Sequence, residues 1–404
     1  MRTSQRVKPK PNANTLRTAH GPSRGRASIT DFIAEAPKSM QAAAKAATFF
    51  LKVFPMLPSK PIDWVTKTPV VERVRYPARI DGRLDWAEGD LYRPAGSGPH
   101  SGHAGIVVCL GVVPFGVDHP QVPRLGEALA RAGFAALLYW SPTMRDMRLD
   151  PVDIENIALA YRWLLEQPYV DPARSGLLGT CVGGSFALMA SANPLIRDKV
   201  GFVTAYAPYS SMLTLARDIA TSTCTNGVGR LGEVRKPWQV DQLTRKVYVR
   251  SITAQLPPSE AALLRDAFSE QASVRTGYVN SMELSEEGRA VYPLLTHLDA
   301  GDVDAALARL PADIRERLAT MSPITYLKDI HAPLVVLCHD SGDKVVPVGE
   351  SRRLVSALFG RPGVRYTELA FQHLNPARLP LLRLLRELAK FYRAVYPLFR
   401  QAVA

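Results

Sequence analysis

A short segment, residues 179–183, contains a cysteine in the pattern glycine–x–nucleophile–x–glycine, after an apolar strand-like run and before a run of small residues. This context favours a sharp strand-to-helix turn that displays its central residue beyond the edge of a sheet. Cys181 would then be exposed at a helix N-terminus, where free N–H groups and the helix dipole favour the nucleophilic thiolate. We therefore predict that Cys181 is a catalytic nucleophile; a structural cysteine in the glycine-rich turn of a nucleotide-binding fold is the competing interpretation. The other cysteines lack such a motif: Cys109, Cys224 and Cys338.

Two loops after later strand-like runs supply an acid and a histidine. The first, residues 339–347, contains Asp343, which we expect to orient a catalytic base, with Asp340 in the same loop as its competitor. The second loop contains His373, which we predict to be the general base; a structural histidine is the alternative at that position. His339, at a strand end, is expected to be structural.

The order nucleophile, acid, histidine is the one expected when a Cys-His-Asp triad is assembled from successive strand ends of one sheet. The oxyanion of a tetrahedral intermediate then needs two backbone N–H donors, normally one after the nucleophile and one from the loop after the third strand. We assign these donors to Val182 and to Val112, which follows Gly111 in a glycine-started loop. No metal-ligand spacing or phosphate-binding GxxxxGK[ST] motif is present, so no cofactor is expected.

The elements that must position these residues follow an α/β pattern. Two extended runs joined through Asp81 and Gly82, a favoured two-residue turn, predict an antiparallel hairpin. Apolar strand-like runs then alternate with helical ones, which predicts a mostly parallel, doubly wound sheet covered by helices on both faces. The alternation is interrupted by short amphipathic helical pieces and then resumes. We expect a basic disordered tail at 1–30, an amphipathic helical extension at 31–66, an α/β core at 67–210 and 327–404, and a helical cap inserted at 211–326.

Positive charge is concentrated at the N-terminus. Net charge is +13, and residues 1–30 hold seven basic residues and no acid, which fits an unstructured arm better than a transit peptide. Apolar residues at helical spacing in 40–54 predict an amphipathic helix; we favour packing on the protein's own body over contact with a membrane surface. No apolar run approaches the roughly 18–20 residues that span a bilayer. We expect a cytoplasmic protein with no specific nucleic-acid partner, peripheral membrane contact through the N-terminal region being the alternative; the oligomeric state is not indicated.

At these residues the chain resembles the α/β-hydrolase superfamily, over about residues 71–209 and from 327 onward. The turn Gly-Thr-Cys-Val-Gly-Gly at 179–184 is similar to the cysteine-containing elbow of the dienelactone hydrolase family. The resemblance implies an α/β-hydrolase fold with an inserted helical cap, on which Cys181, Asp343 and His373 act together. The chain differs from compact dienelactone hydrolases in its N-terminal region, its long insertion and Leu374, where they usually have glycine. The resemblance therefore implies the chemistry and not dienelactone as the substrate.

The expected function is hydrolysis of a carboxylic ester, thioester or lactone of a small-molecule acyl substrate through a thioacyl-enzyme intermediate. Acyl transfer to an alcohol or amine uses the same intermediate and differs in whether the site excludes water. A non-catalytic binding protein with the same fold, recruited through its basic N-terminal region, is the rival that needs no chemistry. Residues expected to shape an acyl pocket in the cap are Trp238, Tyr248 and Arg250.

Overall fold

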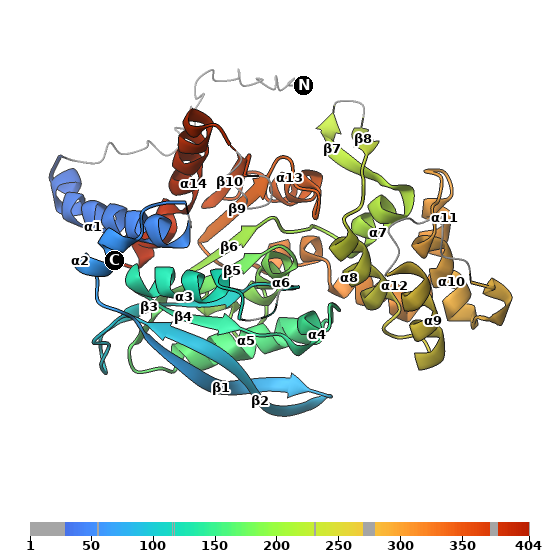
Figure 1. The fold of residues 1–404 in the computed structure, drawn as a ribbon, viewed down its shortest axis with the longest axis horizontal. Helices are drawn as coiled ribbons and strands as arrows, with labels where there is room; N and C mark the ends of the chain where they lie inside the picture. Colours follow the sequence, from blue (N-terminus) through green and yellow to red (C-terminus); the bar gives the residue numbers. More distant parts are fainter. Residues whose placement is uncertain are drawn as a thin grey trace, which may run out of the picture.

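The computed structural model describes residues 29–54, 56–114, 116, 118–229, 232–269, 279–371 and 379–403. A central eight-stranded sheet is covered by helices on both faces, and a mostly helical insertion lies beyond one edge of the sheet, on the right in Figure 1. Most of the predicted tail and the loop that contains His373 lie outside the described residues.

The first two strands form the predicted antiparallel hairpin. β1 (Val70–Ile80) pairs with β2 (Arg83–Arg93) along its whole length. The connecting residues Asp81 and Gly82 have φ values of 48° and 76°. Two successive positive φ values are what a tight two-residue turn between twisted strands requires. The turn therefore fixes the register of the hairpin.

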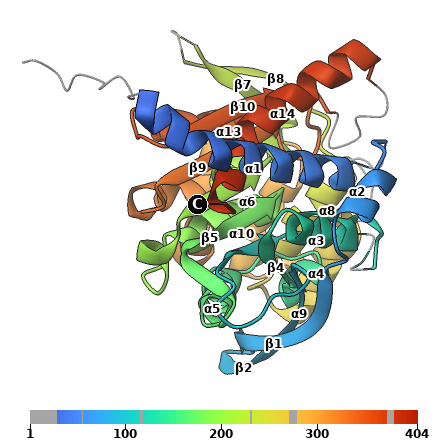
Figure 2. The same ribbon diagram turned by 90° about the vertical axis from the view of Figure 1, so that its left-hand side faces the viewer.

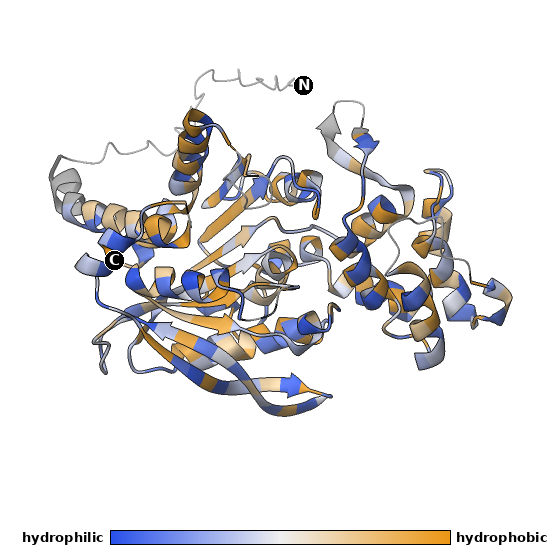
Figure 3. Cartoon of the chain, viewed as in Figure 1, coloured by the Kyte–Doolittle hydropathy of each residue, from blue (hydrophilic) through white to orange (hydrophobic). Residues whose placement is uncertain are grey.

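The strands of the whole sheet follow the order β1-β2-β4-β3-β5-β6-β9-β10. The six strands after β2 are parallel to one another. Only β2 pairs antiparallel with its neighbours, β1 and β4. The inner strands β3, β4, β6 and β9 are buried on both faces and largely apolar, and Figure 3 shows orange along the middle of the sheet. The predicted mostly parallel, doubly wound sheet is confirmed. The parallel strands are β3 (His103–Cys109), β4 (Phe134–Tyr139), β5 (Val170–Thr180), β6 (Phe202–Tyr206), β9 (Leu334–Asp340) and β10 (Val364–Leu369).

Helices on the two faces bury two separate apolar clusters. On one face, side chains such as Ile157 and Phe186 cover the sheet together with residues of the insertion. On the other face, side chains such as Leu129 and Phe399 do so. The first face carries α5 (Val152–Leu165) and α6 (Val182–Ser191), and the second carries α1 (Ile29–Val53), α3 (Gln121–Arg131) and α14 (Leu381–Gln401). Smaller elements of the core are α2 (Lys60–Val65), α4 (Pro142–Arg145), η1 (Arg197–Lys199) and α13 (Val348–Ala357).

The predicted amphipathic helix is part of α1, which is longer than expected and begins at Ile29. Its apolar side chains pack on α14, with ring centroids 5.2 Å apart for Phe49 and Phe399 and 5.3 Å apart for Phe50 and Phe391. Figure 2 shows the two helices crossing the same face of the molecule. The apolar face of α1 is thus covered by the protein's own body.

Between β6 and β9 the chain leaves the sheet and forms the insertion. A hairpin of two strands stands beside its helices, whereas the sequence pattern indicated helices alone. Glycines and charged residues in 223–237 dilute the alternation that identifies a strand. The described elements are α7 (Met212–Thr221), β7 (Thr223–Gly229), β8 (Gly232–Pro237), α8 (Gln242–Ile252), α9 (Pro258–Phe268), η2 (Ser281–Glu283), α10 (Glu286–Leu295), α11 (Val303–Ala308), α12 (Ala312–Thr320), η3 (Pro323–Thr325) and η4 (Leu327–Asp329).

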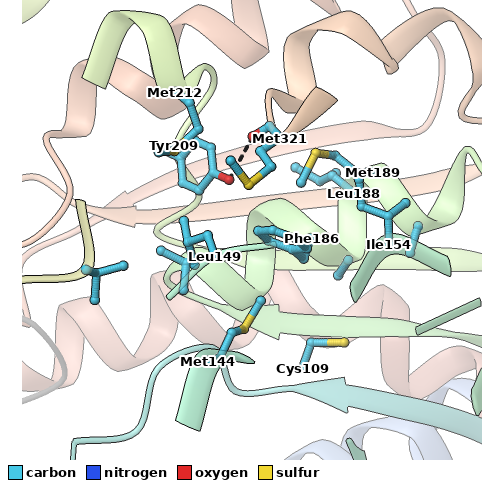
Figure 4. Close-up of a cluster of buried hydrophobic side chains, with 14 of the residues drawn as sticks. Cys109, Met144, Leu149, Ile154, Phe186, Leu188, Met189, Tyr209, Met212 and Met321 are labelled. Carbon is cyan, nitrogen blue, oxygen red and sulfur yellow. Dashed lines mark hydrogen bonds between the residues drawn. The ribbon is translucent and has the colours of Figure 1, made fainter. Parts of the chain in front are cut away.

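The base of the insertion is joined to the core by apolar packing and by a buried carboxylate. Figure 4 shows Phe186 of α6 in one cluster with Tyr209 and Met321, and the Tyr209 hydroxyl donates to the Met321 carbonyl at 2.8 Å. Nearby, the fully buried carboxylate of Glu350 accepts from the Ser210 N–H at 2.7 Å and from the Ser210 hydroxyl at 2.6 Å. These contacts hold the start of α7 against α13.

We expect the substitution Glu350→Ala to lower the free energy of unfolding by about 3–5 kcal/mol, because it leaves the buried Arg353 guanidinium without its carboxylate partner. The control is Glu155→Ala, which breaks a 3.1 Å ion pair with Arg79 whose side chains are 41% and 42% exposed and should cost about 1 kcal/mol or less. Urea denaturation followed by circular dichroism measures both. Equal losses for the two variants would contradict the anchoring role of Glu350.

Candidate active site

Cys181 lies in a strained turn between β5 and α6. Its φ and ψ are 54° and −132°, a conformation that non-glycine residues seldom adopt, and it directly precedes the first residue of α6. Its N–H donates to the Tyr206 carbonyl at 2.7 Å, and its carbonyl accepts from Gly184 at 2.9 Å. The surrounding strand and helix therefore hold the strain in place. The turn predicted from the glycine–x–cysteine–x–glycine pattern is confirmed.

The glycines of the turn are required by close packing against the end of β3. A Cβ built on Gly183 would overlap the Cys109 carbonyl oxygen and would lie 2.5 Å from the Gly111 nitrogen. A Cβ on Gly179 would lie 2.6 Å from the Gly184 Cα. No side chain fits at such separations without a backbone shift. The loop after β3 is thus packed directly against the turn that contains Cys181.

This contact places the loop that contains Val112, one of the two predicted oxyanion donors, beside the turn of Cys181. The Thr180 hydroxyl donates to the Leu110 carbonyl at 3.0 Å, and Gly111 turns the chain with a φ of 74° just before Val112. The N–H of Val182 interacts with the Cys181 sulfur. Within the described residues, neither the Val112 nor the Val182 N–H donates to a backbone carbonyl. Their assignment as oxyanion donors stays a prediction.

Asp343 follows β9 in the predicted loop, with a side chain that is fully buried. Its Oδ1 accepts from the Val345 N–H at 2.7 Å and from the Val346 N–H at 3.0 Å, which fixes the orientation of the carboxylate. Its negative charge acts on the Cys181 thiol and contributes to raising the thiol pKa. Asp343 and Cys181 are therefore brought to one site; the role of Asp343 as the orienting acid stays a prediction.

The competing acid Asp340 and the expected structural histidine His339 have contacts of their own. Asp340 ends β9, and its Oδ1 accepts from the Gly342 N–H at 2.9 Å. His339 is fully buried, with Nδ1 2.6 Å from the Ser351 hydroxyl and Nε2 2.9 Å from the Val346 carbonyl oxygen. Burial lowers the pKa of this imidazole. His339 thus has the contacts of a neutral structural side chain, as the sequence indicated.

The predicted base His373 belongs to residues 372–378, which lie outside the described part of the chain. The strand before it is described: β10 pairs in parallel with β9, and Leu369 is opposite Asp340. The Ser341 N–H donates to the Leu369 carbonyl at 2.8 Å. Both strands thus end at the edge of the sheet where Asp343 is found.

The ionisation expected for Cys181 is corrected by its surroundings. The residue is partly buried rather than exposed, and burial raises the pKa of its thiol to about 12, with further increases from the charges of Asp343 and Asp241. The hydrogen bond from Val182 opposes this increase but is the weaker influence. Desolvation disfavours the thiolate more than the helix N-terminus favours it. In these surroundings the thiol holds its proton at neutral pH.

Asp241 is a neighbour of Cys181 that sequence reasoning missed. It caps α8 in the insertion, where its Oδ1 accepts from the Leu243 N–H at 2.9 Å. Its charge contributes to raising the Cys181 pKa, although the two residues are far apart in sequence. An aspartate before a helix predicts a cap. Only the packing of the insertion against the core brings the charge of this carboxylate to act on Cys181.

The thiol pKa of about 12 predicts how Cys181 reacts with iodoacetamide. Alkylation should be slow near pH 7 and should accelerate about tenfold per pH unit beyond pH 9, because only the thiolate reacts. The folded chain should also lose stability as the pH rises from 9 toward about 12, since the unfolded thiol, with its ordinary pKa of 9.0, loses its proton first. Mass spectrometry of the Cys181 peptide over a pH series measures the rate, with glutathione as the reference thiol. A rate that levels off below pH 7 would show a preformed thiolate instead.

A hollow of about 190 Å³ separates the β7–β8 hairpin from the loop that holds Asp343. Trp238 lines it, and its indole N–H donates to the Lys344 carbonyl at 3.1 Å. Tyr248 is instead buried within the insertion, and Arg250 donates to the Asp146 carbonyl at 3.2 Å. A larger hollow of about 500 Å³, lined by residues such as Arg162 and Pro333, includes none of the predicted site residues. Of the three residues expected to shape a pocket, Trp238 is the one that lines the hollow beside Asp343.

Among the residues that the structure covers, no group of histidine, cysteine, aspartate and glutamate side chains could hold a metal ion. In the same part of the chain, every helix is too short or too polar to cross a membrane.

Comparison with known proteins gives partial matches. No family model matches the chain. It is 36% identical over 89 residues to a "Probable 2-oxo-3-(5-oxofuran-2-ylidene)propanoate lactonase" of Bradyrhizobium sp, covering 18% of this chain and 36% of that protein. It is 32% identical over 117 residues to the "Bile acid-CoA:amino acid N-acyltransferase" of Mus musculus, covering 28% of this chain and 26% of that protein. The chain thus spans about a third or less of the curated relatives that it matches.

Solved structures that resemble the chain include an acylaminoacyl peptidase of Pyrococcus horikoshii, 15% identical, with a TM-score of 0.48 over 83% of this chain and 43% of that chain. A 2,6-dihydroxy-pseudo-oxynicotine hydrolase is 13% identical, with a TM-score of 0.44 over 80% of this chain and 68% of that chain. The strand order and the strained strand-to-helix turn after β5 decide the architecture. The chain has the α/β-hydrolase fold. Its mostly parallel sheet carries Cys181 and Asp343 at the carboxyl ends of β5 and β9.

Proposed function

We propose that this α/β-hydrolase-fold chain is an acyl-transferring enzyme that cleaves an ester, thioester or lactone through a thioacyl intermediate on Cys181. The observation that carries the proposal is the strained turn that presents Cys181 at the start of α6 with the Asp343 carboxylate nearby. Structural cysteines need neither a positive φ nor three flanking glycines packed against backbone. Strain of this kind persists where the protein uses the position.

In the proposed mechanism, His373 removes the Cys181 proton as the sulfur attacks the acyl carbon. The S–C bond forms, the carbonyl electron pair moves onto oxygen, and the Val112 and Val182 N–H groups bind the oxyanion. Collapse breaks the bond to the leaving group, which takes the proton from His373. Water then attacks the thioacyl carbon, gives a proton to His373, and releases the acid as the Cys181 thiol is restored.

The raised pKa of Cys181 makes the base a necessary part of this mechanism. A thiol with a pKa of about 12 is almost entirely protonated at neutral pH. Attack therefore needs a group that accepts the proton while the S–C bond forms. In the proposal, His373 is that group, and the fixed carboxylate of Asp343 stabilises the imidazolium that results.

Trapping the intermediate tests the proposal. The full chain is mixed with p-nitrophenyl acetate, quenched with acid within the first turnover, and digested. We expect the Cys181 peptide to gain the mass of one acetyl group and p-nitrophenolate to appear as a burst. The peptides that contain Cys109, Cys224 and Cys338 serve as internal controls, because these cysteines are buried and lack a strained turn. Turnover of the ester without any acyl adduct on Cys181 would contradict the proposal.

Acyl transfer to an amine is the second candidate. One observation favours it: the similarity to the mouse protein named "Bile acid-CoA:amino acid N-acyltransferase". The lactonase similarity favours hydrolysis. Product analysis of the same reaction with added glycine separates them, since transfer gives N-acetylglycine and hydrolysis gives acetate.

A further inference from the structure

The first two turns of α14 are apolar on more than one side. Leu384 and Leu388 face inward and pack on the cluster beneath α14. Leu381, Leu382 and Leu385 face outward and are 68%, 83% and 52% exposed. Spacings of three and four residues put the outward leucines on one stripe of the helix. A helix segment that is apolar on both sides is normally covered on both sides.

A stripe of basic residues runs beside these leucines. Arg383, Arg386, Lys390 and Arg393 follow one another at intervals of three and four residues, next to the leucine stripe. The acid of α14, Glu387, is 4% exposed and is bonded to Lys390 at 2.7 Å. Within the described residues, Arg383 and Arg386 make neither an ion pair nor a hydrogen bond. The exposed end of α14 therefore combines apolar area with uncompensated positive charge.

The patch formed by Leu381, Leu382, Leu385, Arg383 and Arg386 lies near the candidate active site. Glu387 Oε2 accepts from the N–H of Ala370, directly after β10, at 3.0 Å. This bond fixes the second turn of α14 at the carboxyl end of the strand, on the edge of the sheet that carries Asp343. The first turn extends beyond the anchored turn, and Figures 1 and 2 show this end of α14 projecting from the body.

The charges of the patch decide which occupant fits. A symmetric contact between two copies through this patch would bring Arg383 and Arg386 against their own counterparts. Residues 1–30 of the same chain are basic without an acid, so they are repelled as well. An anionic bilayer surface accepts leucines into its interface and attracts arginines to its headgroups. The basic N-terminal residues add attraction of the same sign.

We propose that the projecting end of α14 is a peripheral docking site for an anionic lipid membrane. Leu381, Leu382 and Leu385 enter the interface, and Arg383 and Arg386 contact the headgroups. Docking does not depend on the proposed chemistry, so each can fail separately.

Co-sedimentation of the full chain with vesicles tests the docking site. The probes are vesicles of phosphatidylcholine alone and of phosphatidylcholine mixed with phosphatidylserine, at low and at physiological salt. We expect binding to the mixed vesicles and a partition constant about tenfold lower or more for L381Q/L382Q/L385Q. R383Q/R386Q should bind more weakly and with a smaller salt dependence. All of these chains keep the basic N-terminal residues, so their differences report on α14 alone.

The matched control is L84Q/L195Q/L263Q, which removes three leucines that are 63%, 45% and 44% exposed on other surfaces. It should bind mixed vesicles as the unaltered chain does, and melting curves of all variants check the fold. Three results overturn the proposal: no binding of the unaltered chain to mixed vesicles, equal binding by the two triple variants, or a dimer in sedimentation equilibrium that L381Q/L382Q/L385Q abolishes.

Discussion

The substitution Cys181→Ala is expected to lower kcat for hydrolysis of an activated ester by about a million-fold, the loss typical of removing the nucleophile of a triad. The physical reason is that no thioacyl intermediate can form, so water must attack the substrate directly. Stability should change little, because Cys181 is partly exposed and its strained backbone accepts alanine no worse than cysteine. Initial rates with p-nitrophenyl acetate measure the activity, and thermal denaturation measures the stability.

Cys224→Ala is the matched control for this prediction. Cys224 belongs to β7, is 3% exposed and lines the hollow beside Asp343. Its substitution therefore shows the effect on kcat of removing a buried thiol near the site that has no proposed role in catalysis. We expect its kcat to stay within a few-fold of the unaltered chain. A Cys181→Ala variant that keeps a tenth or more of the activity would exclude the thioacyl mechanism.

Asp343→Asn should lower kcat by about 10,000-fold, whereas Asp340→Asn should have a much smaller effect. The amide oxygen can still accept from Val345 and Val346 as Oδ1 does, but the amide carries no charge to stabilise an imidazolium and places an NH2 group where the second carboxylate oxygen was. Asp340 offers the same chemical change in the same loop, where its Oδ1 accepts from Gly342. The comparison therefore separates loss of the orienting charge from disturbance of the loop.

The measurement is kcat and kcat/KM over a pH series for both variants, with urea denaturation as the check on folding. Loss of activity in Asp340→Asn with retention in Asp343→Asn would reverse the assignment of the acid. Equal and moderate losses, matched by equal losses of stability, would show that both carboxylates only shape the loop.

Most of the architecture could be predicted because its signals are local. The inner parallel strands are buried on both faces, so their sequences are apolar runs. The hairpin turn at Asp81 and Gly82 is encoded by residues that tolerate positive φ. The β7–β8 hairpin was missed because glycines and charges obscure its alternation. Its stability comes from neighbours such as α13, where Arg353 donates to the Thr225 hydroxyl, and such contacts leave no local pattern.

The candidate site was predictable to a similar extent. The turn at Cys181 follows from glycines that keep backbone atoms close, and the loop of Asp343 follows from its place after a buried strand. The proximity of Asp241 could not be foreseen, because it depends on how the insertion lies over the sheet. His373 lies outside the described residues, so its part in the site rests on the order of residues along the chain.

The sequence by itself determined the α/β order of elements, the strained turn and the loop that follows β9, because periodicity and glycine placement act over a few residues. Tertiary structure decided what the sequence left open or misjudged. Burial and two carboxylates raise the pKa of Cys181, where the helix N-terminus alone indicated a lower one. The apolar face of α1 is covered by α14, while the leucines at the start of α14 remain exposed. Desolvation and exposure depend on every neighbour in space, and these neighbours come from segments far apart in the chain.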